Sequence, residues 1–242
     1  MKENINDNNF IHQPIDLGYS DLITETKTSG RKYNTPDGKA YPSITTVLSI
    51  LSEDGIAKWR ARVGEEVANK ISTRASKRGT AVHEALEKYV NNVPWKELLD
   101  TQTPDVIQSI KSVRDVLDKS LGIVYGQEIP LYSDHLRLAG RVDCVAEFNG
   151  KTSIIDYKTS KKPKPRKFIE NYFCQEAAYA IMWEERTRMP ITQLVTLIAV
   201  DEIQGAPGCQ VVIESRDNWT QMLLETIEKY EQRQNTPNIR IG

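Results

Sequence analysis

The stretch that decides the fold spans residues 140–160 and reads GRVDCVAEFNGKTSIIDYKTS. Both halves read as β-strands, and the Asn149-Gly150 dipeptide between them is typical of a tight hairpin turn. The second half is apolar at first and then ends in Asp156, Tyr157 and Lys158. Because side chains alternate along a strand, Asp156 and Lys158 project to the same face.

A second carboxylate, Asp143, lies on the first strand of this hairpin, within reach of Asp156. Two carboxylates at short range repel each other, and a divalent cation that prefers oxygen ligands relieves the repulsion. Lys158 beside them has the chemistry to orient a water molecule and to offset charge that develops at a phosphate. The tripeptide Asp-x-Lys is common at strand ends. Asp156 and Lys158 are therefore alternatively interpreted as a surface salt bridge.

Helical and strand patterns surround this hairpin. Residues 1–30 show no sustained period, which predicts a flexible N-terminal arm, and Pro36-Asp37-Gly38 predicts a turn between two brief strands. Ser43 is the expected N-cap of a helix. Further helices are predicted over 56–75, 79–91, 104–117, 168–188 and 217–234, and further strands over 124–131, 194–200 and 210–213.

These elements predict an α/β fold with a central mixed β-sheet flanked by helices and a helical N-terminal portion. We expect a single domain over residues 31–242. Its helical part covers 31–121, and the sheet with the C-terminal helices covers 122–242.

The composition excludes several classes of protein. The chain has 242 residues, 32 Lys plus Arg against 33 Asp plus Glu, and a formal net charge of −1. This excludes collagen-like and largely disordered proteins, and it argues against a globally basic surface. No window approaches the roughly eighteen apolar residues of a membrane span, and the N-terminal stretch lacks a signal or transit pattern. We therefore expect no membrane contact and a cytoplasmic protein.

Three cysteines, Cys144, Cys174 and Cys209, stand singly in the chain. They form no paired motif of the kind that holds structural zinc or a four-cysteine iron–sulfur cluster. We expect no iron–sulfur cluster.

Two helical segments carry further candidates. His83 and Glu87 lie four residues apart and share a helix face, and a neutral imidazole is a good metal ligand. Gln175 and Tyr179 share a face in the same way on the helix after the hairpin. Taken alone, His83 is more often a capped or half-buried helix residue than a ligand, and a pair such as Gln175 and Tyr179 is usually rim packing.

A basic run follows the hairpin. Residues 158–167 include six basic side chains and no acid, which predicts phosphate contacts beside the site, although a solvated loop explains the run as well. Arg78, with Arg74 and Lys77, is predicted to line the other side of a channel. Glu128, on the strand before the hairpin, is a candidate for organising the charged cluster. The members of the run that are candidates for phosphate contact are Lys161, Lys162 and Lys164.

The motifs occur in the order Gly79-Thr80-x-x-His83-x-x-x-Glu87, Gly140-x-x-Asp143, Asp156-Tyr157-Lys158-Thr159 and Gln175-x-x-x-Tyr179. This order resembles the RecB-like branch of the PD-(D/E)XK nucleases. Within that branch, residues 41–45, 143–147, 155–160 and 162–165 look like the mitochondrial genome maintenance exonucleases. The likeness spans roughly residues 41–200. Position 142 is Val, not the Pro of the superfamily's name, and this departure is common in the branch.

The resemblance implies a restriction-endonuclease-like core and a metal-dependent exonuclease that acts on single-stranded DNA ends or flaps in replication, repair or recombination. It implies that His83, Asp143 and Asp156, with the backbone carbonyl of Tyr157, bind Mg²⁺ or Mn²⁺. Lys158 would be the catalytic lysine. The absence of a transit pattern suggests a bacterial or bacteriophage relative. Side chains that would support the site or contact the DNA strand are Gln175, Tyr179, Glu87, Thr159 and Arg78.

Two other functions stay open. A structure-specific endonuclease would use the same charged residues. A non-catalytic DNA-binding module of a replication complex would keep the fold without cleavage, although such a module has no physical reason to keep a crowded carboxylate pair. The sequence names no protein partner among replication or recombination proteins.

Overall fold

The computed structural model describes residues 9–235, and residues 1–8 and 236–242 lie outside this range. Its centre is a five-stranded sheet in the order β4-β5-β6-β7-β8. The pair β6–β7 is parallel and the other pairs are antiparallel, so the sheet is mixed, as predicted. The strands are β4 (Leu121–Ser133), β5 (Leu138–Phe148), β6 (Lys151–Ser160), β7 (Gln193–Ile203) and β8 (Ala206–Ser215).

The hairpin between β5 and β6 turns at the predicted dipeptide. Asn149 and Gly150 have φ values of 52° and 75°, the left-handed pair that a tight two-residue turn requires. The register pairs Cys144 with Ile155, which places Asp143 and Asp156 one position further along the two strands.

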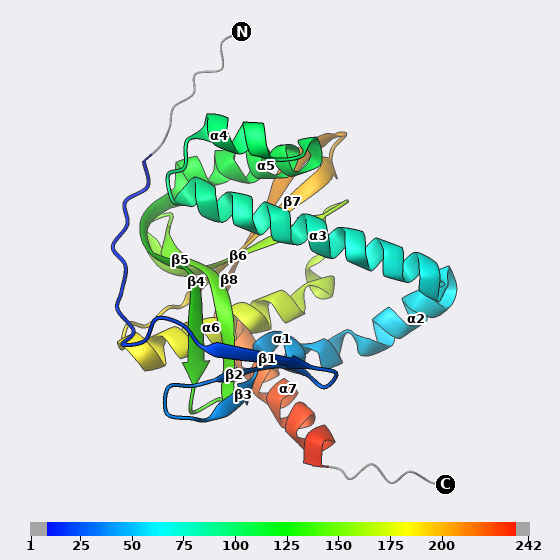
Figure 1. Ribbon diagram of the computed structural model, residues 1–242, viewed down its shortest axis with the longest axis vertical. Coiled ribbons are helices and arrows are strands. Elements are labelled where there is room, and N and C mark those ends of the chain that lie inside the picture. Colours follow the sequence, from blue (N-terminus) through cyan, green and yellow to red (C-terminus); the bar gives the residue numbers. More distant parts are fainter. Residues whose placement is uncertain (1–8, 236–242) are drawn as a thin grey trace.

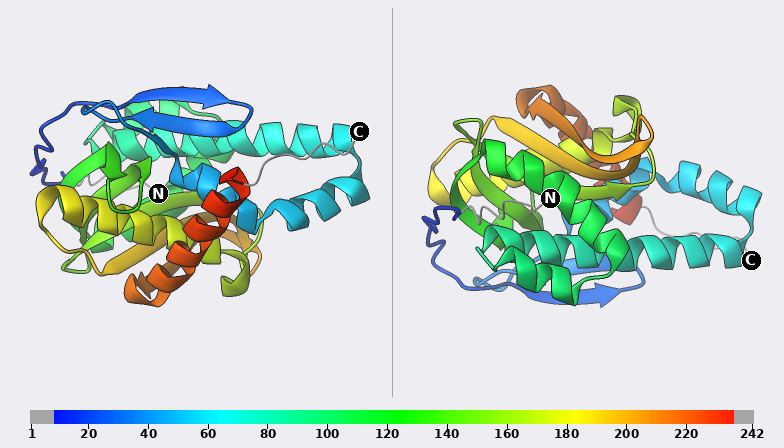
Figure 2. Two further views of the ribbon diagram at one scale, coloured as in Figure 1. Left: turned by 90° about the horizontal axis from the view of Figure 1, so that it is seen from below. Right: turned by 90° about the horizontal axis from the view of Figure 1, so that it is seen from above.

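Helices cover both faces of this sheet (Figures 1 and 2). One face packs against α1 (Ile44–Leu48), α6 (Glu170–Thr187) and α7 (Asp217–Asn235). The other packs against α3 (Glu65–Val90) and α5 (Pro104–Ser120), with α4 (Trp95–Thr101) beside them. The helix α6 carries the chain from β6 to the parallel strand β7, as a parallel pair requires.

Side chains alternate along β6 and pack into the hydrophobic cores on both faces of the sheet. Ile154 is buried in the core beneath α6, whereas Ile155 and Tyr157 are buried in the core beneath α3 and α5. A strand with two buried faces reads as a continuous apolar run. Asp156 and Lys158 therefore share the face on the α6 side, which agrees with the predicted alternation.

The helices before the sheet differ from the prediction. Two helices were expected over 56–75 and 79–91, but α2 (Glu53–Val63) ends at Gly64 and α3 runs unbroken to Val90. Gly64 has φ 85°, a left-handed conformation that favours glycine and ends the helix, whereas Gly79 continues it.

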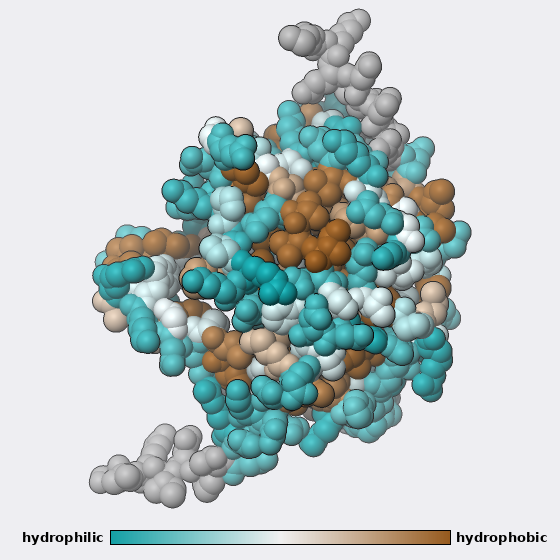
Figure 3. Space-filling model, turned by 180° about the vertical axis from the view of Figure 1, so that it is seen from behind, coloured by the Kyte–Doolittle hydropathy of each residue, from teal (hydrophilic) through white to brown (hydrophobic). Residues whose placement is uncertain are grey.

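The helix α2 and the first half of α3 form a hairpin that projects beyond the body (Figures 1 and 2). Its apolar residues are largely uncovered: Ile56, Val67 and Ile71 are 48%, 49% and 45% exposed. Figure 3 shows this hairpin from behind, at the left edge, with a strip of hydrophobic surface along it.

The N-terminal segment is attached to the domain from residue 9 onward, so the expected flexible arm is wrong for residues 9–30. Phe10 is buried, and its backbone N–H donates to Asn92 Oδ1 at 2.7 Å. The strand β1 (Ile23–Lys27) pairs with β2 (Gly30–Asn34), which pairs with β3 (Ala40–Pro42). All of β1 is exposed, so no apolar alternation marked it. Residues 1–8 of the expected arm lie outside the described residues.

Two short 3-10 helices, η1 (Ser49–Leu51) and η2 (Arg166–Phe168), complete the elements within residues 9–235. None of the helices in this range has the length and apolar character needed to span a bilayer.

Candidate active site

A cavity of about 680 Å³ opens where β4, β5 and β6 meet α3, α1 and α6. Seven of the candidate residues singled out by sequence line it: His83, Glu87, Glu128, Asp143, Lys158, Gln175 and Tyr179. The four motifs therefore converge on one place, although they come from separate parts of the chain.

Asp143 and Asp156 occupy neighbouring positions of β5 and β6. The backbone N–H of Tyr157 donates to Asp143 Oδ2 at 2.8 Å, which fixes this carboxylate against the adjoining strand. Asp156 is 1% exposed and forms an ion pair with Lys158. Gln175, on α6, donates from Nε2 to Asp156 Oδ1 at 3.3 Å.

The imidazole of His83 approaches these strands from α3. Its Nδ1 atom lies 3.4 Å from Asp143 Oδ2, and its ring meets the Tyr157 ring edge-on at 6.1 Å between centroids. Val82 and Leu86 on the same helix are fully buried, so they anchor α3 against the sheet and hold His83 in place.

Glu128 completes the cluster from β4, opposite Asp143 in the strand register. One of its carboxylate oxygens lies within 4.8 Å of the ligand atoms of both His83 and Asp143. Its φ is 50°, a strained conformation for a residue with a side chain, and such strain clusters at functional sites. Arg141 Nη1 donates to the Glu128 carbonyl at 2.6 Å and braces this backbone.

The carboxyl groups at the site differ in the direction in which their pKa values are shifted. Burial and the charge of Asp143 raise the pKa of Glu128 to about 7. Burial raises the pKa of Asp156 to about 6, against the opposing effect of Lys158. Burial alone would also raise the pKa of Asp143, but His83 and Lys158 outweigh it and hold that pKa below its usual value.

This donor set fits a divalent cation. Atoms bound to one ion at about 2.0–2.2 Å are at most about 4.4 Å apart, and the three donors, within 4.8 Å, need little adjustment to meet that limit. A cation would also relieve the repulsion that raises the pKa of Glu128. The residues that would hold it are His83, Glu128 and Asp143.

The sequence profile of the PD-(D/E)XK nuclease superfamily matches residues 54–240. The chain belongs to this superfamily. The mixed sheet with helices on both faces is consistent with its fold, so the predicted fold class is confirmed.

Curated relatives point to one group of this superfamily. The chain is 29% identical over 215 residues to human mitochondrial genome maintenance exonuclease 1, covering 82% of this chain and 60% of the human protein. The Xenopus tropicalis protein of the same name is 42% identical over 151 residues, covering 57% of this chain and 42% of that protein. The chain thus spans about 60% of the length of the human relative it matches.

Among solved structures, a candidate exonuclease from Eubacterium rectale aligns with a TM-score of 0.42 and 10% identity. The alignment covers 64% of this chain and 65% of that chain.

In this nuclease domain, the candidate site residues predicted on helices line the cavity, except Arg78. Tyr179 is 2% exposed and packs against Gly140, where an added Cβ would lie 2.7 Å from Tyr179 Cε1. Glu87 and Gln175 also line the cavity. Arg78 does not: its guanidinium donates to Asp201 Oδ2 at 3.0 Å and to Ser109 Oγ at 2.8 Å.

Apart from Lys158, the basic run lies outside the cavity of the nuclease domain. Lys164 donates its backbone N–H to Gln210 Oε1 at 2.8 Å, and Arg166 holds Glu214 at 2.6 and 2.9 Å, so the loop follows β8. The cavity lining includes none of Thr159, Lys161, Lys162 and Lys164. These residues therefore do not form the cavity wall, and their contact with phosphates beside the site stays a prediction.

Sequence patterns assigned no functional role to the residues of the wall opposite the sheet, although residues 41–45 were part of the family resemblance. Arg31 and Tyr33 from β2 and residues 43–45 at the start of α1 line the cavity there. Ser43 caps α1, accepting from Thr46 N–H at 3.1 Å as predicted. Tertiary packing alone brings these residues to the site.

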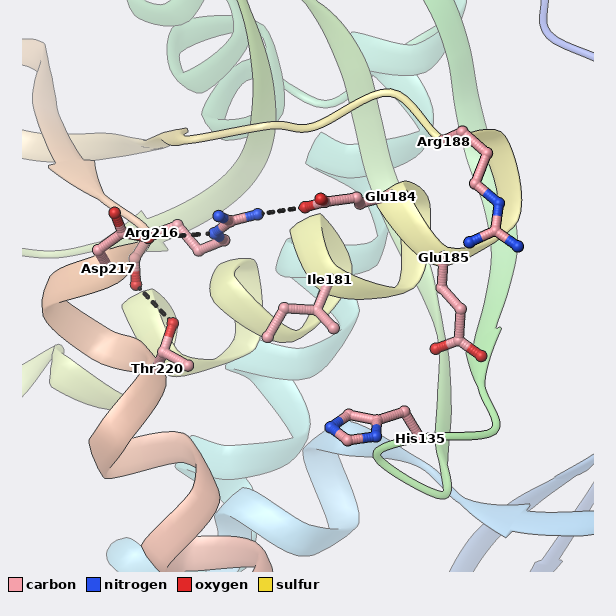
Figure 4. A pocket seen from close by; sticks show the side chains of 8 residues that line it. All are labelled: His135, Ile181, Glu184, Glu185, Arg188, Arg216, Asp217 and Thr220. Atoms are coloured by element: carbon pink, nitrogen blue, oxygen red, sulfur yellow. Dashed lines mark hydrogen bonds and ion pairs between the residues drawn. The ribbon is translucent and has the colours of Figure 1, made fainter.

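A second hollow, about 570 Å³, lies between α6 and α7 (Figure 4). Its charged side chains neutralise one another: Arg216 contacts Glu184 at 2.5 Å and Asp217 at 3.4 Å. It offers no cluster comparable to His83, Glu128 and Asp143.

Proposed function

We propose that the protein is a metal-dependent exonuclease that hydrolyses phosphodiester bonds at the ends of single-stranded DNA. The observation that carries the proposal is that His83, Asp143 and Lys158 line one cavity, with the buried Asp156 paired to Lys158 directly behind its wall. The relatives named as exonucleases support it.

The side chains have separate roles in this proposal. Lys158 is the catalytic lysine: the charges of Asp156 and Asp143 outweigh its burial and raise its pKa, so the ammonium stays charged and can stabilise negative charge on the phosphate. Asp156 orients Lys158, and Gln175 in turn orients Asp156. A divalent cation, Mg²⁺ or Mn²⁺, would supply Lewis-acid polarisation of the phosphate and lower the pKa of a nearby water.

His83, Asp143 and Glu128 would hold the cation. Asp156 and the carbonyl of Tyr157 are further ligands in the proposal, since both lie beside Asp143 on the adjoining strand. Asp143 gains its orientation from the Tyr157 N–H, and His83 gains its orientation from Asp143.

The preference for a single strand rests on the projecting hairpin of α2 and α3. The same helix α3 supplies both the hairpin and the cavity residues Gly79, Thr80 and His83. In this proposal the DNA strand runs past the hairpin to the cavity, and the hairpin excludes a duplex. Exposed apolar side chains on the hairpin, such as Val67 and Ile71, suit contact with unpaired bases.

End-labelled oligonucleotides test this function directly. Digestion with Mg²⁺ or Mn²⁺ should shorten linear single strands progressively, should stop in EDTA, and should leave duplexes largely intact. A circular single strand should resist. Cleavage of the circle would replace the exonuclease with an endonuclease, and binding without any cleavage would favour the non-catalytic module.

A further inference from the structure

A third hollow, about 710 Å³, runs where α3 meets the beginning of α5, and these two helices lie side by side (Figure 1). We call it the α3–α5 groove. From α3 it is lined by Lys70, Arg74 and Lys77, which are four and three residues apart and so share one helix face. His83 belongs to the catalytic cavity, so the two hollows use different faces of the same helix.

The lining of the α3–α5 groove is predominantly basic. Its charged residues are Lys70, Arg74, Lys77 and Arg78 against a single acid, Asp105, and of these cations Arg78 is paired with Asp201 outside the lining. Arg74 and Lys77 are solvent-exposed. Lys70 contacts Glu66 at 2.7 Å, but both side chains are more than 70% exposed, and exposed pairs of this kind are weak.

Asp105 does little to offset these charges. Its carboxylate accepts a hydrogen bond from Thr103 Oγ1 at 2.7 Å and lies in the first turn of α5. The helix dipole places partial positive charge at that end, which compensates the carboxylate locally. The groove therefore keeps a positive field that attracts anions.

We propose that the α3–α5 groove binds the phosphodiester backbone of the DNA strand whose end occupies the catalytic cavity, an inference that rests on the proposed function. Lys77 is six residues from His83, about 9 Å along the helix axis, and Lys70 is about 20 Å away. A strand that crosses α3 at Gly79 and Thr80 passes from one hollow to the other. The groove thus holds phosphates several nucleotides from the scissile bond.

The chemistry of the lining indicates contact with phosphates and not with bases. Cations and small side chains line the α3–α5 groove, and none of its described lining residues is aromatic. Phosphate contacts position a strand without reading its sequence. We therefore expect the groove to extend the binding site for long strands of any sequence.

The test neutralises the groove while leaving the cavity intact. The variant Lys70→Gln/Arg74→Gln/Lys77→Gln changes only exposed side chains. In EDTA, where the strand stays whole, the plot of log binding constant against log salt for a long single strand should become shallower by about 2, because each lost phosphate contact removes about 0.7. With metal, KM for long strands should rise at constant kcat, and a substrate of about four nucleotides should be cleaved as by the unmodified protein.

A matched control removes the same charge elsewhere. Lys88→Gln/Lys151→Gln/Lys229→Gln neutralises three exposed lysines outside both hollows and should keep the original salt slope. An unchanged slope in the groove variant, or an equal loss of slope in the control, would contradict phosphate binding in the α3–α5 groove. If the unmodified protein cleaves no DNA but the groove variant alone loses slope, the groove stands and the proposed catalysis fails.

Discussion

His83 Nδ1 lies 3.4 Å from Asp143 Oδ2, and this contact joins α3 to β5 at the cavity. Burial lowers the pKa of His83, but Asp143 outweighs that effect and raises it above its usual value. Across the same cavity, Asp156 holds Lys158. The two acids thus connect to helices on opposite faces of the sheet. Asp143 contacts His83 of α3, and Asp156 accepts a hydrogen bond from Gln175 of α6.

Removing the lysine should separate catalysis from binding. We expect Lys158→Ala to lower the rate of cleavage by at least about 100-fold, the usual effect of losing one group that stabilises a transition state. Single-strand binding should stay close to that of the unmodified protein. The measurements are single-turnover cleavage and binding by fluorescence anisotropy.

Lys151→Ala is the control, because Lys151 lies at the opposite end of the same strand β6 and is exposed. It should cleave normally. Full activity in Lys158→Ala would remove Lys158 from the catalytic role.

A cation that binds the folded protein should raise its stability by mass action. At a Mn²⁺ concentration about 100 times the dissociation constant, the free energy of unfolding should increase by about 2.7 kcal/mol. Thermal unfolding with and without Mn²⁺ measures this shift. In Asp143→Asn or Glu128→Gln the shift should shrink, because each variant removes a charged oxygen ligand from the cluster.

Glu184→Gln provides the comparison, since Glu184 lies in the hollow between α6 and α7. It should keep the full response to Mn²⁺. A response that survives in Asp143→Asn would place the cation elsewhere.

Local signals predicted the β5–β6 hairpin accurately, because Asn149-Gly150 defines its turn and alternation defines its faces. Asp143 and Asp156 followed from that register. Sequence neighbourhood gave less information about which residues line the cavity: residues 161–167 follow β8, and Arg78 contacts Asp201. Nothing local in the sequence determines where a loop turns or what a long side chain reaches.

The same distinction applies to Glu128. Its position opposite Asp143 depends on the pairing of β4 with β5, which the sequence suggested only as consecutive strands. The hydrophobic period across residues 56–75 predicted a packed helix, but α2 and α3 separate at Gly64 and leave Val67 exposed. Periodicity reports which residues share a face, and it does not report whether another element covers that face.

A buried acid outside the proposed catalytic set predicts a pH-dependent stability. Glu176 is fully buried and accepts a hydrogen bond from Thr196, while within residues 9–235 its second oxygen has no hydrogen-bond partner. Burial, and then the charge of Asp156, raise its pKa well above the usual value. Its contribution to stability is fully present below the unfolded pKa of about 4.3 and is lost as pH rises toward the folded pKa.

Glu176→Gln keeps the shape but cannot ionise. Its free energy of unfolding, relative to the unmodified protein, should therefore rise with pH above about 4.3, by up to about 1.4 kcal/mol per pH unit. Urea unfolding between mildly acidic and mildly alkaline pH measures the difference. The exposed Glu202, where no burial opposes the charge, supplies the control Glu202→Gln. A difference that falls with pH would contradict the assignment.

The close packing around Gly140 at the site leaves no room for a side chain. A Cβ there would lie 2.7 Å from Tyr179 Cε1 and 3.1 Å from Ile44 Cγ2, and both neighbours are buried. Because neither has room to move, we expect Gly140→Ala to lower the free energy of unfolding by about 1–3 kcal/mol, the usual cost of overpacking. Cleavage should fall as Tyr179 is displaced.

Gly79→Ala is the matched comparison, because a Cβ at Gly79 meets nothing within 4 Å and the residue lies inside α3. Alanine favours a helix interior over glycine by about 1 kcal/mol, so this variant should be stabilised. Chemical unfolding of both variants distinguishes the two glycines. If Gly140→Ala proves as stable as Gly79→Ala, Tyr179 and Ile44 are less confined than their contacts with Gly140 imply.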